Sequence, residues 1–476
     1  MSGIISTRAC ETNLRGAWLA SAAVLALSAF APVALADDPP PPPPADAEPM
    51  PPPPPEEVGA PPMAVEKVVV TATRRETQLV KTPVAVTAIS GKTLEAAEVE
   101  SIEDLMAVVP SLVITNNGHP FAYTTRIRGI GTQGDNPGLE AAVGTFIDGV
   151  YRSRPGVAMS DLGEMDRVEV LRGPQGTLFG RNTSAGIINV ITKKPTWENE
   201  IWGEVTGGSY DLLATRGGFN AVIAPDQLAL RINGVRQERE GYIDVNPGRP
   251  DAYDGNATSF WGGRGQLLWQ PTQDVSLRIV GDYAERQDEC CSAVTIANGL
   301  RSGPGTNFGF GRAPTVAFPD TSGPAIINSI ESPFPGKAAT SQLENFVAFG
   351  DRSTDANTTD KGVSGELNWR FGGTKLTSIT AFRQWENDYG QDVDFSGADI
   401  LYFPDDGTNF NEFETFTHET RLNGEAGWVN WLVGVFYSNE DITRQQRLRF
   451  GADMETFLSQ HRVGDSALAL RGALAA

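Results

Sequence analysis

The stretch Asp166–Pro195, DRVEVLRGPQGTLFGRNTSAGIINVITKKP, decides how this sequence is interpreted. It places two β-prone runs, Arg167–Arg172 and Gly186–Thr192, on either side of a glycine-rich segment. Glycines such as Gly173 permit a tight turn, a positive φ or a close approach of two backbones. Polar residues from Asn182 onward can bond to local backbone groups. The stretch therefore predicts a strand, a compact turn and a second strand.

Motifs for nucleotide binding and nucleophilic catalysis do not fit this stretch. Its glycines lie at the wrong separations for a phosphate-binding loop or a dinucleotide fingerprint, and Arg181-Asn182 stands where Lys-Ser/Thr is needed. The run Asn182–Gly186 has asparagine where a nucleophile elbow needs its first glycine. The chain's three histidines, His119, His418 and His461, have no zinc or catalytic-triad spacing. We therefore expect no enzyme activity, no catalytic residue, no cofactor and no bound metal.

Composition limits the kind of partner. The chain has 476 residues, with 38 lysines and arginines against 59 aspartates and glutamates, and a formal net charge of −21. Nucleic-acid binding needs a cationic face, so this balance argues against a nucleic acid partner. Charged residues make up only 20%, and glycine and asparagine recur between short apolar runs. Such a mixture is typical of many strands joined by turns.

The first 65 residues are predicted to be export and spacer segments. Arg8 and Arg15 precede an uncharged apolar run that closes at Ala34-Leu35-Ala36, so residues 1–36 are predicted to be a secretory signal peptide. An uncleaved transmembrane anchor is the alternative, because the run is ~20 residues long. Residues 37–65 are rich in proline and predict a disordered, extended spacer.

A β-prone run, EKVVVTAT at residues 66–73, follows this spacer directly. A flexible tether that ends in one such strand suits pairing with the sheet edge of another protein. The alternative is an ordinary first strand of the next domain. Both interpretations make this short segment a β-strand.

Residues 74–195 are predicted to form a compact α+β domain. The spacing of apolar residues predicts a helix over Gly91–Val109, which ends before Pro110. Loops rich in glycine, proline and asparagine separate the β-prone runs of the domain. These runs are Val84–Ile89, Leu112–Ile114, Thr125–Gly129, Gly144–Asp148, Arg167–Arg172 and Gly186–Thr192.

Residues 199–476 have a different pattern, in which runs of about ten residues alternate in polarity, as in transmembrane β-barrels. A water-soluble sandwich also alternates. The connections favour the barrel, because short turns and long links follow one another in turn. The short turns are 224–227, 270–274, 371–374 and 424–427, and the long links are 241–258, 287–360 and 389–412. Six tryptophans near expected strand ends suit interfacial girdles: Trp261, Trp269, Trp369, Trp385, Trp428 and Trp431.

Several motifs together resemble those of the TonB-dependent outer-membrane receptors. Asp166–Pro195 is similar to the closing segment of that family's plug domain. RIRGIG at Arg126–Gly131 and FIDGVY at Phe146–Tyr151 are similar to two further plug motifs. EKVVVTA at Glu66–Ala72 resembles the TonB box. By these motifs the chain is identified as a siderophore-type member of this family.

The resemblance implies a plug domain inside an antiparallel transmembrane β-barrel of about 22 strands, in the outer membrane of a Gram-negative bacterium. It implies active uptake of a scarce nutrient, expected to be a ferric siderophore complex, with carbohydrate, vitamin and haem as alternatives. TonB and its inner-membrane energising partners are the expected protein partners. Outer-membrane lipid is expected to surround the barrel.

Residue roles follow from the same resemblance. TonB is expected to bind by strand addition to Glu66, Lys67, Val68, Val69, Val70, Thr71 and Ala72. Arg128 and Arg172 match plug arginines that pair with barrel-wall glutamates in some members. Four side chains in apical loops are candidates for contact with an anionic or aromatic ligand, with solvated loop residues as the alternative: His119, Tyr151, Arg152 and Arg154.

The chain departs from the family in its wall. The sequence predicts only about nine or ten strands against about 22 in the family, and its end, GDSALALRGALAA, has no aromatic terminal strand. We therefore expect a C-terminally truncated, incomplete barrel, whose two unpaired sheet edges lipid cannot satisfy. A non-functional remnant with a soluble periplasmic plug is the corresponding alternative to a transporter.

Two further features lie in the long links. Cys290 and Cys291 are adjacent, and either a neighbour-to-neighbour disulfide or two free thiols fits the sequence. Residues 386–414 are strongly acidic, but their oxygen ligands do not follow the calcium-loop pattern. We expect a solvated outer loop there.

Overall fold

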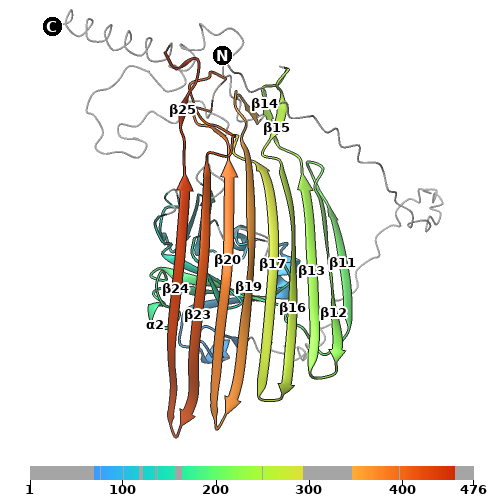
Figure 1. The fold of residues 1–476 in the computed structure, drawn as a ribbon, viewed down its shortest axis with the longest axis vertical. Coiled ribbons are helices and arrows are strands. Elements are labelled where there is room, and N and C mark those ends of the chain that lie inside the picture. The colour runs from blue at the N-terminus through green and yellow to red at the C-terminus, as the bar shows by residue number, and fades with distance from the viewer. Residues whose placement is uncertain are drawn as a thin grey trace, which may run out of the picture. The chain divides into compact units, whose positions relative to one another are not determined.

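The computed structural model describes residues 69–292 and 346–455, except positions 76, 100, 117–121, 135, 137, 155, 157–162, 249 and 396. The predicted signal peptide, the predicted spacer and most of the link 287–360 lie outside the described residues. So do Glu66, Lys67, Val68 and His119 among the predicted site residues. The described chain contains a small α+β domain followed by a long antiparallel sheet, called the plug and the wall below (Figure 1).

The plug is built on a five-stranded sheet with the order β3-β9-β10-β7-β8. Its strands are β3 Val86–Ser90, β7 Val143–Ile147, β8 Val150–Arg152, β9 Met165–Arg172 and β10 Gly186–Thr192. Strand β10 pairs antiparallel with β9 and parallel with β7. A second sheet contains β4 Leu112–Asn116, β5 Tyr123–Ile127 and β6 Ile130–Gly131, and a separate pair contains β1 Val69–Val70 and β2 Thr77–Gln78. The predicted plug strands are thus confirmed to within a few residues.

The opening stretch forms the centre of this sheet. Strand β10 is buried along nearly its whole length, which explains why its sequence is almost continuously apolar. Gly180 has a φ of 83°, and a Cβ on Gly186 would lie 2.3 Å from the Leu171 carbonyl oxygen. Both glycines therefore serve the backbone geometry, as expected. The turn also contains a short helix, α2 Gly176–Phe179, that the sequence did not predict.

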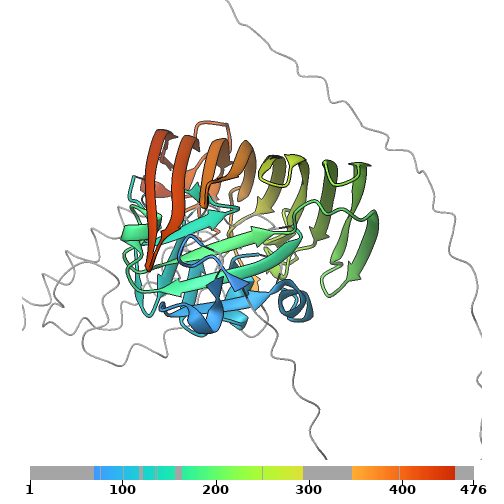
Figure 2. The same cartoon turned by 90° about the horizontal axis from the view of Figure 1, so that it is seen from below.

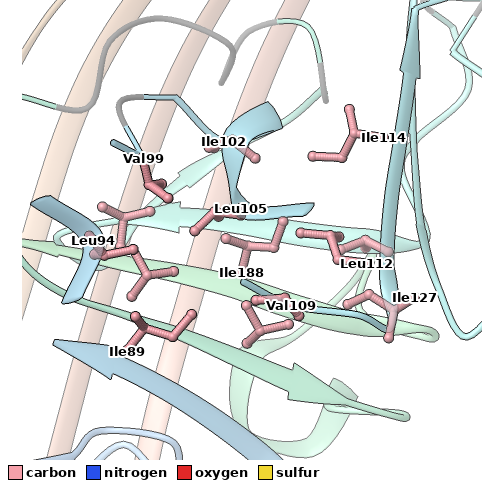
Figure 3. Close-up of a cluster of buried hydrophobic side chains, with 14 of the residues drawn as sticks. Ile89, Leu94, Val99, Ile102, Leu105, Val109, Leu112, Ile114, Ile127 and Ile188 are labelled. Atoms are coloured by element: carbon pink, nitrogen blue, oxygen red, sulfur yellow. The ribbon is translucent and has the colours of Figure 1, made fainter. Parts of the chain in front are cut away.

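The predicted helix over residues 91–109 is wrong in its middle. The structure has α1 Gly91–Ala96 and a separate 3₁₀ helix, η2 Glu103–Ala107. Glu98 between them has a φ of 52°, which ends the first helix. The Ser101 backbone N–H donates to the Asp104 carboxylate at 2.8 Å, which favours a new start at η2. The apolar spacing still brings both pieces onto the sheet, where Leu94, Ile102 and Leu105 pack with Ile188 in the core (Figure 3).

The wall is a nine-stranded antiparallel sheet whose neighbours follow sequence order. It contains β11 Glu200–Gly207, β12 Leu213–Ala224, β13 Leu228–Arg239, β16 Thr258–Thr272, β17 Val275–Glu289, β19 Asp355–Phe371, β20 Thr374–Tyr389, β23 Phe410–Ala426 and β24 Val429–Gln445. Short hairpin turns lie at one end, while β14 Ile243–Val245, β15 Tyr253–Gly255 and β25 Arg449–Phe450 lie at the other (Figure 1). The small strands β18 Val347–Ala348, β21 Gln391–Asp392 and β22 Leu401–Phe403 also belong to the long links. The predicted strand number and the alternation of short and long connections are confirmed.

The two faces of the wall have the reverse polarity of a soluble sandwich. On β17, Arg278 is 4% exposed while its neighbour Ile279 is 43% exposed. One outward row crosses the sheet through directly paired residues: Ile201, Phe219, Ile232, Gly265, Gly281, Val363, Phe382 and Phe416. Every non-glycine member of this row is exposed. An apolar outer face with a polar inner face is the pattern of a transmembrane barrel wall.

The tryptophan prediction is right for some residues and wrong for Trp385. Trp261, Trp269, Trp369 and Trp428 are exposed, as interfacial residues should be. Trp385 is only 3% exposed and packs on the inner face beside Phe413, with ring centroids 5.3 Å apart. Side chains alternate between the two faces along a strand. In β20 this alternation places Phe382 on the outer face and Trp385 on the inner face. Among the described residues, no helix is long and apolar enough to cross a membrane.

Candidate functional site

The plug lies against the inner face of the wall, and buried charges join the two (Figure 2). Asp148, in the loop after β7, accepts from Arg264 of β16 at 3.1 Å and lies 3.5 Å from Arg278 of β17. Thr192 donates its backbone N–H and its hydroxyl to the same carboxylate. Burial opposes ionisation of Asp148, but Arg278 and Arg264 lower its pKa below the ordinary value. This carboxylate therefore anchors the plug as an anion.

A second anchor joins Glu164 to β13. Arg231 is 2% exposed, and its Nε donates to the Glu164 carboxylate at 2.8 Å while a second nitrogen pairs with the other oxygen. Asn233 of the same strand donates to Glu164 at 3.2 Å. This bidentate pairing of a guanidinium with a carboxylate fixes the relative orientation of the two side chains as well as their distance. No local sequence pattern distinguishes Glu164 or Arg231, since the two residues lie far apart along the chain.

The predicted ligand residues Tyr151, Arg152 and Arg154 are all buried. Arg152 pairs with Asp360 of β19 at 3.6 Å, and Arg154 pairs with Glu440 of β24 at 3.0 Å. The Tyr151 hydroxyl accepts from the Asn182 side chain at 2.8 Å. Burial raises the pKa of Tyr151 to about 12 despite this bond. In this structure the three side chains join the plug internally or to the wall, and their contact with a ligand stays a prediction.

Arg128 and Arg172 lie elsewhere. Arg128 is exposed in the turn after β5 with a φ of 54°, and its backbone N–H donates to Ser111. Arg172 ends β9, and its Nε is buried without a hydrogen-bond partner. Within the described part of the chain neither guanidinium forms an ion pair, so the predicted contacts with wall glutamates stay a prediction. The contacts that join plug and wall here involve other residues.

The described part of the predicted TonB box is docked on the plug. Val70 and Ala72 are fully buried and pack with Phe146, Leu171 and Phe179. The Thr71 backbone N–H donates to the Glu169 carboxylate of β9 at 2.8 Å. The segment Val69–Ala72 is therefore held on the five-stranded sheet by apolar packing and by a buried carboxylate.

Arg74 connects the next residues of this segment to the wall. Its Nε donates to the Leu178 carbonyl at 3.1 Å, and its guanidinium lies 3.3 Å from the Glu419 carboxylate of β23. It also stacks over Phe179, 4.1 Å from the ring centroid. Burial lowers the pKa of Arg74 to about 10, against the opposing effect of Glu419. The beginning of the described chain thus contacts both plug and wall.

A cavity of about 1180 Å³ lies between the plug and part of the inner face of β11–β17. Its plug side includes Glu95, Glu98, Glu103 and Asp104, and its wall side mixes arginines such as Arg216 and Arg286 with carboxylates such as Glu204 and Asp288. This volume exceeds that of a typical small-molecule pocket. Charged groups of both signs line the space and make it polar, so water or a polar solute fits it better than an apolar one.

The structure describes the adjacent cysteines and the acidic residues of the long links. Cys290 and Cys291 form a disulfide, which selects one of the two alternatives. In the acidic link, Asp392 is buried beside Asp394 and Asp351, and burial followed by these charges raises its pKa to about 8. Among the described residues, no group of three or more His, Cys, Asp or Glu side chains is arranged to hold a metal ion.

Comparison with known proteins identifies the plug directly. Residues 78–187 match the family described as TonB-dependent Receptor Plug Domain. The chain is 33% identical over 185 residues to the pesticin receptor of Yersinia pestis, covering 38% of this chain and 26% of that protein. It is 32% identical over 132 residues to the vitamin B12 transporter BtuB of Vibrio vulnificus, covering 27% and 20%. The chain thus spans about a quarter of the length of these curated relatives.

The fold extends the likeness into the wall. The crystal structure of the ferric yersiniabactin uptake receptor FyuA from Yersinia pestis matches with a TM-score of 0.60 and 19% identity. That match covers 77% of this chain and 50% of FyuA. The matched family consists of receptors and transporters, in agreement with the expectation that the chain is not an enzyme. Residues 78–187 therefore match the plug domain of the TonB-dependent receptors, and the plug and wall together share the fold of the FyuA structure.

Proposed function

We propose that this chain is part of an outer-membrane transporter that takes up a ferric siderophore complex, with energy supplied through TonB. The observation that carries the proposal is a plug anchored by buried ion pairs to the polar inner face of a wall whose outer face is apolar. A blocked lumen needs an energy source to open. The name of the ferric yersiniabactin uptake receptor FyuA supports an iron-complex substrate.

In this proposal TonB binds the predicted box, Glu66–Ala72, by strand addition. Val70 and Ala72 are fully buried on the plug, so the segment must leave its docking site before a partner strand can pair with it. Pulling on the segment would act on the plug through Thr71 and Glu169. The inner-membrane partners of TonB would supply the force.

The proposed ligand contacts also require movement of the plug. Arg152 and Arg154 offer guanidinium groups suited to an anionic ferric complex. Glu440 pairs with Arg154 at 3.0 Å, whereas Arg152 lies 3.6 Å from Asp360 and its Nε and Nη1 have no hydrogen-bond partner among the described residues. A ligand anion would therefore compete with Glu440 for Arg154 and could bind the unused donors of Arg152. Such an exchange would couple ligand binding to the plug–wall contacts.

Iron-limited growth tests the proposal. Cells that carry the gene and cells in which it is deleted would be grown with each of a panel of purified ferric siderophores as sole iron source. We expect the deletion to abolish growth on one complex and to leave growth on ferric citrate unchanged. The ferric siderophore assignment would be contradicted if the deletion strain grew unchanged on every siderophore and expression of the gene did not change under iron starvation.

Membrane fractionation tests the location independently. A transporter partitions with the outer membrane, whereas a remnant with a soluble plug appears in the periplasmic fraction. We expect the outer-membrane fraction, because the outward row from Ile201 to Phe416 is apolar and exposed.

A corrinoid is the second candidate substrate. The identity of 32% to a vitamin B12 transporter over 132 residues favours it. Growth of the deletion strain with cyanocobalamin as sole corrinoid separates the two. Loss of growth there, with iron uptake intact, would select the corrinoid.

A further inference from the structure

Glu169 is a carboxylate at the centre of the plug sheet with no solvent exposure. It accepts the Thr71 backbone N–H at 2.8 Å and the Thr71 hydroxyl at 3.1 Å. Arg167 of the same strand donates its Nε at 2.9 Å, and Asn189 of β10 donates its side-chain amide at 3.4 Å. The carboxylate thus has two donors from the N-terminal segment and two from the sheet.

Asn189 closes this arrangement. It lies directly opposite Glu169 in the pairing of β10 with β9, and its amide also donates to the Thr71 hydroxyl at 3.2 Å. Hydrogen bonds to an ionised acceptor are stronger than neutral ones, and the Arg167 guanidinium places a positive charge beside this carboxylate. The three side chains therefore form one connected polar site that receives Thr71.

Backbone pairing does not attach the segment to the sheet. Within the described residues, β1 pairs only with β2, through Val69 with Gln78 and Val70 with Thr77. These two strands form their own small sheet, separate from the five-stranded one. The polar attachment of residues 69–72 to the central sheet therefore depends on the side chains of Glu169 and Asn189.

We propose that Glu169 is a positioning residue that holds Val69–Ala72 on the plug and so sets how often this segment is released to a periplasmic partner protein. The inference rests on the proposed function only for the identity of that partner. Release breaks both Thr71 bonds at once, and Glu169 keeps Arg167 and Asn189 as partners. The plug sheet can therefore stay folded while the segment leaves it.

Trypsin cleavage after Arg74 and Arg75 measures release. The Arg74 guanidinium is buried when the segment is docked, so the protease reaches it only after release. At a low trypsin concentration the cleavage rate follows the population of the released form. The full chain in isolated outer-membrane fragments would be digested without ligand or TonB, and cleavage at each arginine and lysine of the plug would be quantified by mass spectrometry.

We expect Glu169→Ala to raise cleavage after Arg74 and Arg75 by about tenfold or more, the factor that corresponds to lost hydrogen bonds to a charged group. Glu169→Gln keeps one acceptor oxygen and should give a smaller increase. Glu164→Gln is the matched control, because Glu164 is also a buried plug carboxylate but contacts Arg231 and Asn233 of the wall instead of Thr71. It should leave cleavage after Arg74 unchanged.

Either of two outcomes in Glu169→Ala would overturn the proposal. One is an unchanged cleavage rate after Arg74 and Arg75 in Glu169→Ala. The other is an equal increase at distant plug sites such as Lys92 and Arg126, which would show general loosening of the plug. If the Glu169 variants do not fold, Thr71→Val removes the hydroxyl donor with Glu169 intact, and an unchanged rate there also overturns it. A failed siderophore assay does not affect this result, because no substrate is used.

Discussion

The guanidinium of Arg74 lies 3.3 Å from the carboxylate of Glu419, and this contact joins the start of the described chain to the late wall strand β23. Both side chains are almost fully buried. Arg421 lies beside them and pairs with Glu419 at 2.7 Å. A single wall carboxylate therefore balances one arginine of the plug and one of the wall.

Removal of Arg74 should loosen the segment that contains it. We expect Arg74→Ala to destabilise the docked hairpin 69–78 by about 3 kcal/mol, the usual effect of breaking a buried ion pair. Glu419→Gln should cost at least as much, because it leaves both Arg74 and Arg421 without their shared carboxylate. Hydrogen exchange of residues 69–78 in both single variants and the double variant measures their coupling. Additive effects within about 0.5 kcal/mol would show that the contact is not coupled.

Asp148 should be an acid-dependent anchor of the plug. Asp148→Asn leaves Arg264 and Arg278 without their shared plug carboxylate and should cost about 3 kcal/mol of unfolding free energy. Asp166→Asn is the control, since the Asp166 carboxylate is half exposed and should change stability by less than about 0.5 kcal/mol. Urea unfolding followed by tryptophan fluorescence measures both variants. Equal stability of the two would contradict the anchoring role.

The same residue predicts a pH effect. Its pKa is lowered in the folded protein, so its stabilising contribution is fully present above the ordinary pKa of aspartate. The contribution is lost as the pH falls below that value through the lowered folded pKa. Acid unfolding of Asp148→Asn should therefore depend less steeply on pH than that of the unsubstituted protein. Parallel acid titration curves would contradict this prediction.

Asp392 should have the opposite pH dependence. Its pKa is raised to about 8, so the folded state binds a proton that the unfolded chain has already lost. Stability should decrease as the pH rises from about 4 to 8, and Asp392→Asn should remove this slope. Thermal unfolding midpoints at a series of pH values measure it. Asp406→Asn, an exposed carboxylate of the same link, is the control. A slope that persists in Asp392→Asn would assign the effect to other groups.

The outward row of the wall makes a test of the membrane assignment. Val363→Arg places a charge in the middle of that row and should reduce folding into lipid vesicles by about 2–4 kcal/mol. On the surface of a soluble sheet the same change would cost only about 0.5 kcal/mol. Urea titration of folding into vesicles measures the difference, with Gln273→Arg in the exposed turn between β16 and β17 as control. A small effect at residue 363 would contradict a lipid-facing wall.

Local sequence patterns predicted most of the secondary structure. The strand Gly186–Thr192 was predicted with the bounds that the structure has, because a buried central strand is a continuous apolar run. Turns such as the one before Leu228 were predicted because the turn preferences of glycine, proline and aspartate depend only on the local backbone. The helix prediction over residues 91–109 failed because apolar spacing does not register a positive φ at Glu98.

The candidate site was predicted less well. The motifs led to Val69–Ala72 and to three further side chains, Tyr151, Arg152 and Arg154. They gave no indication that Val70, Ala72 and these three side chains are buried against other parts of the protein. The anchors Glu164 and Arg231 had no signal at all. An ion pair between residues far apart in the chain has no periodicity, and only the register of the strands brings its members together.

The sequence by itself determined the number of wall strands, the order of short and long connections and the β-strands of the plug, because each depends on residues within a few positions. The tertiary structure alone decided which face of the wall is polar and buried, why Trp385 lies inside, and which charges meet. The docking of Thr71 on Glu169 belongs to this second group. Burial of a carboxylate is tolerated only where donors converge on it, and that convergence exists only in the folded chain.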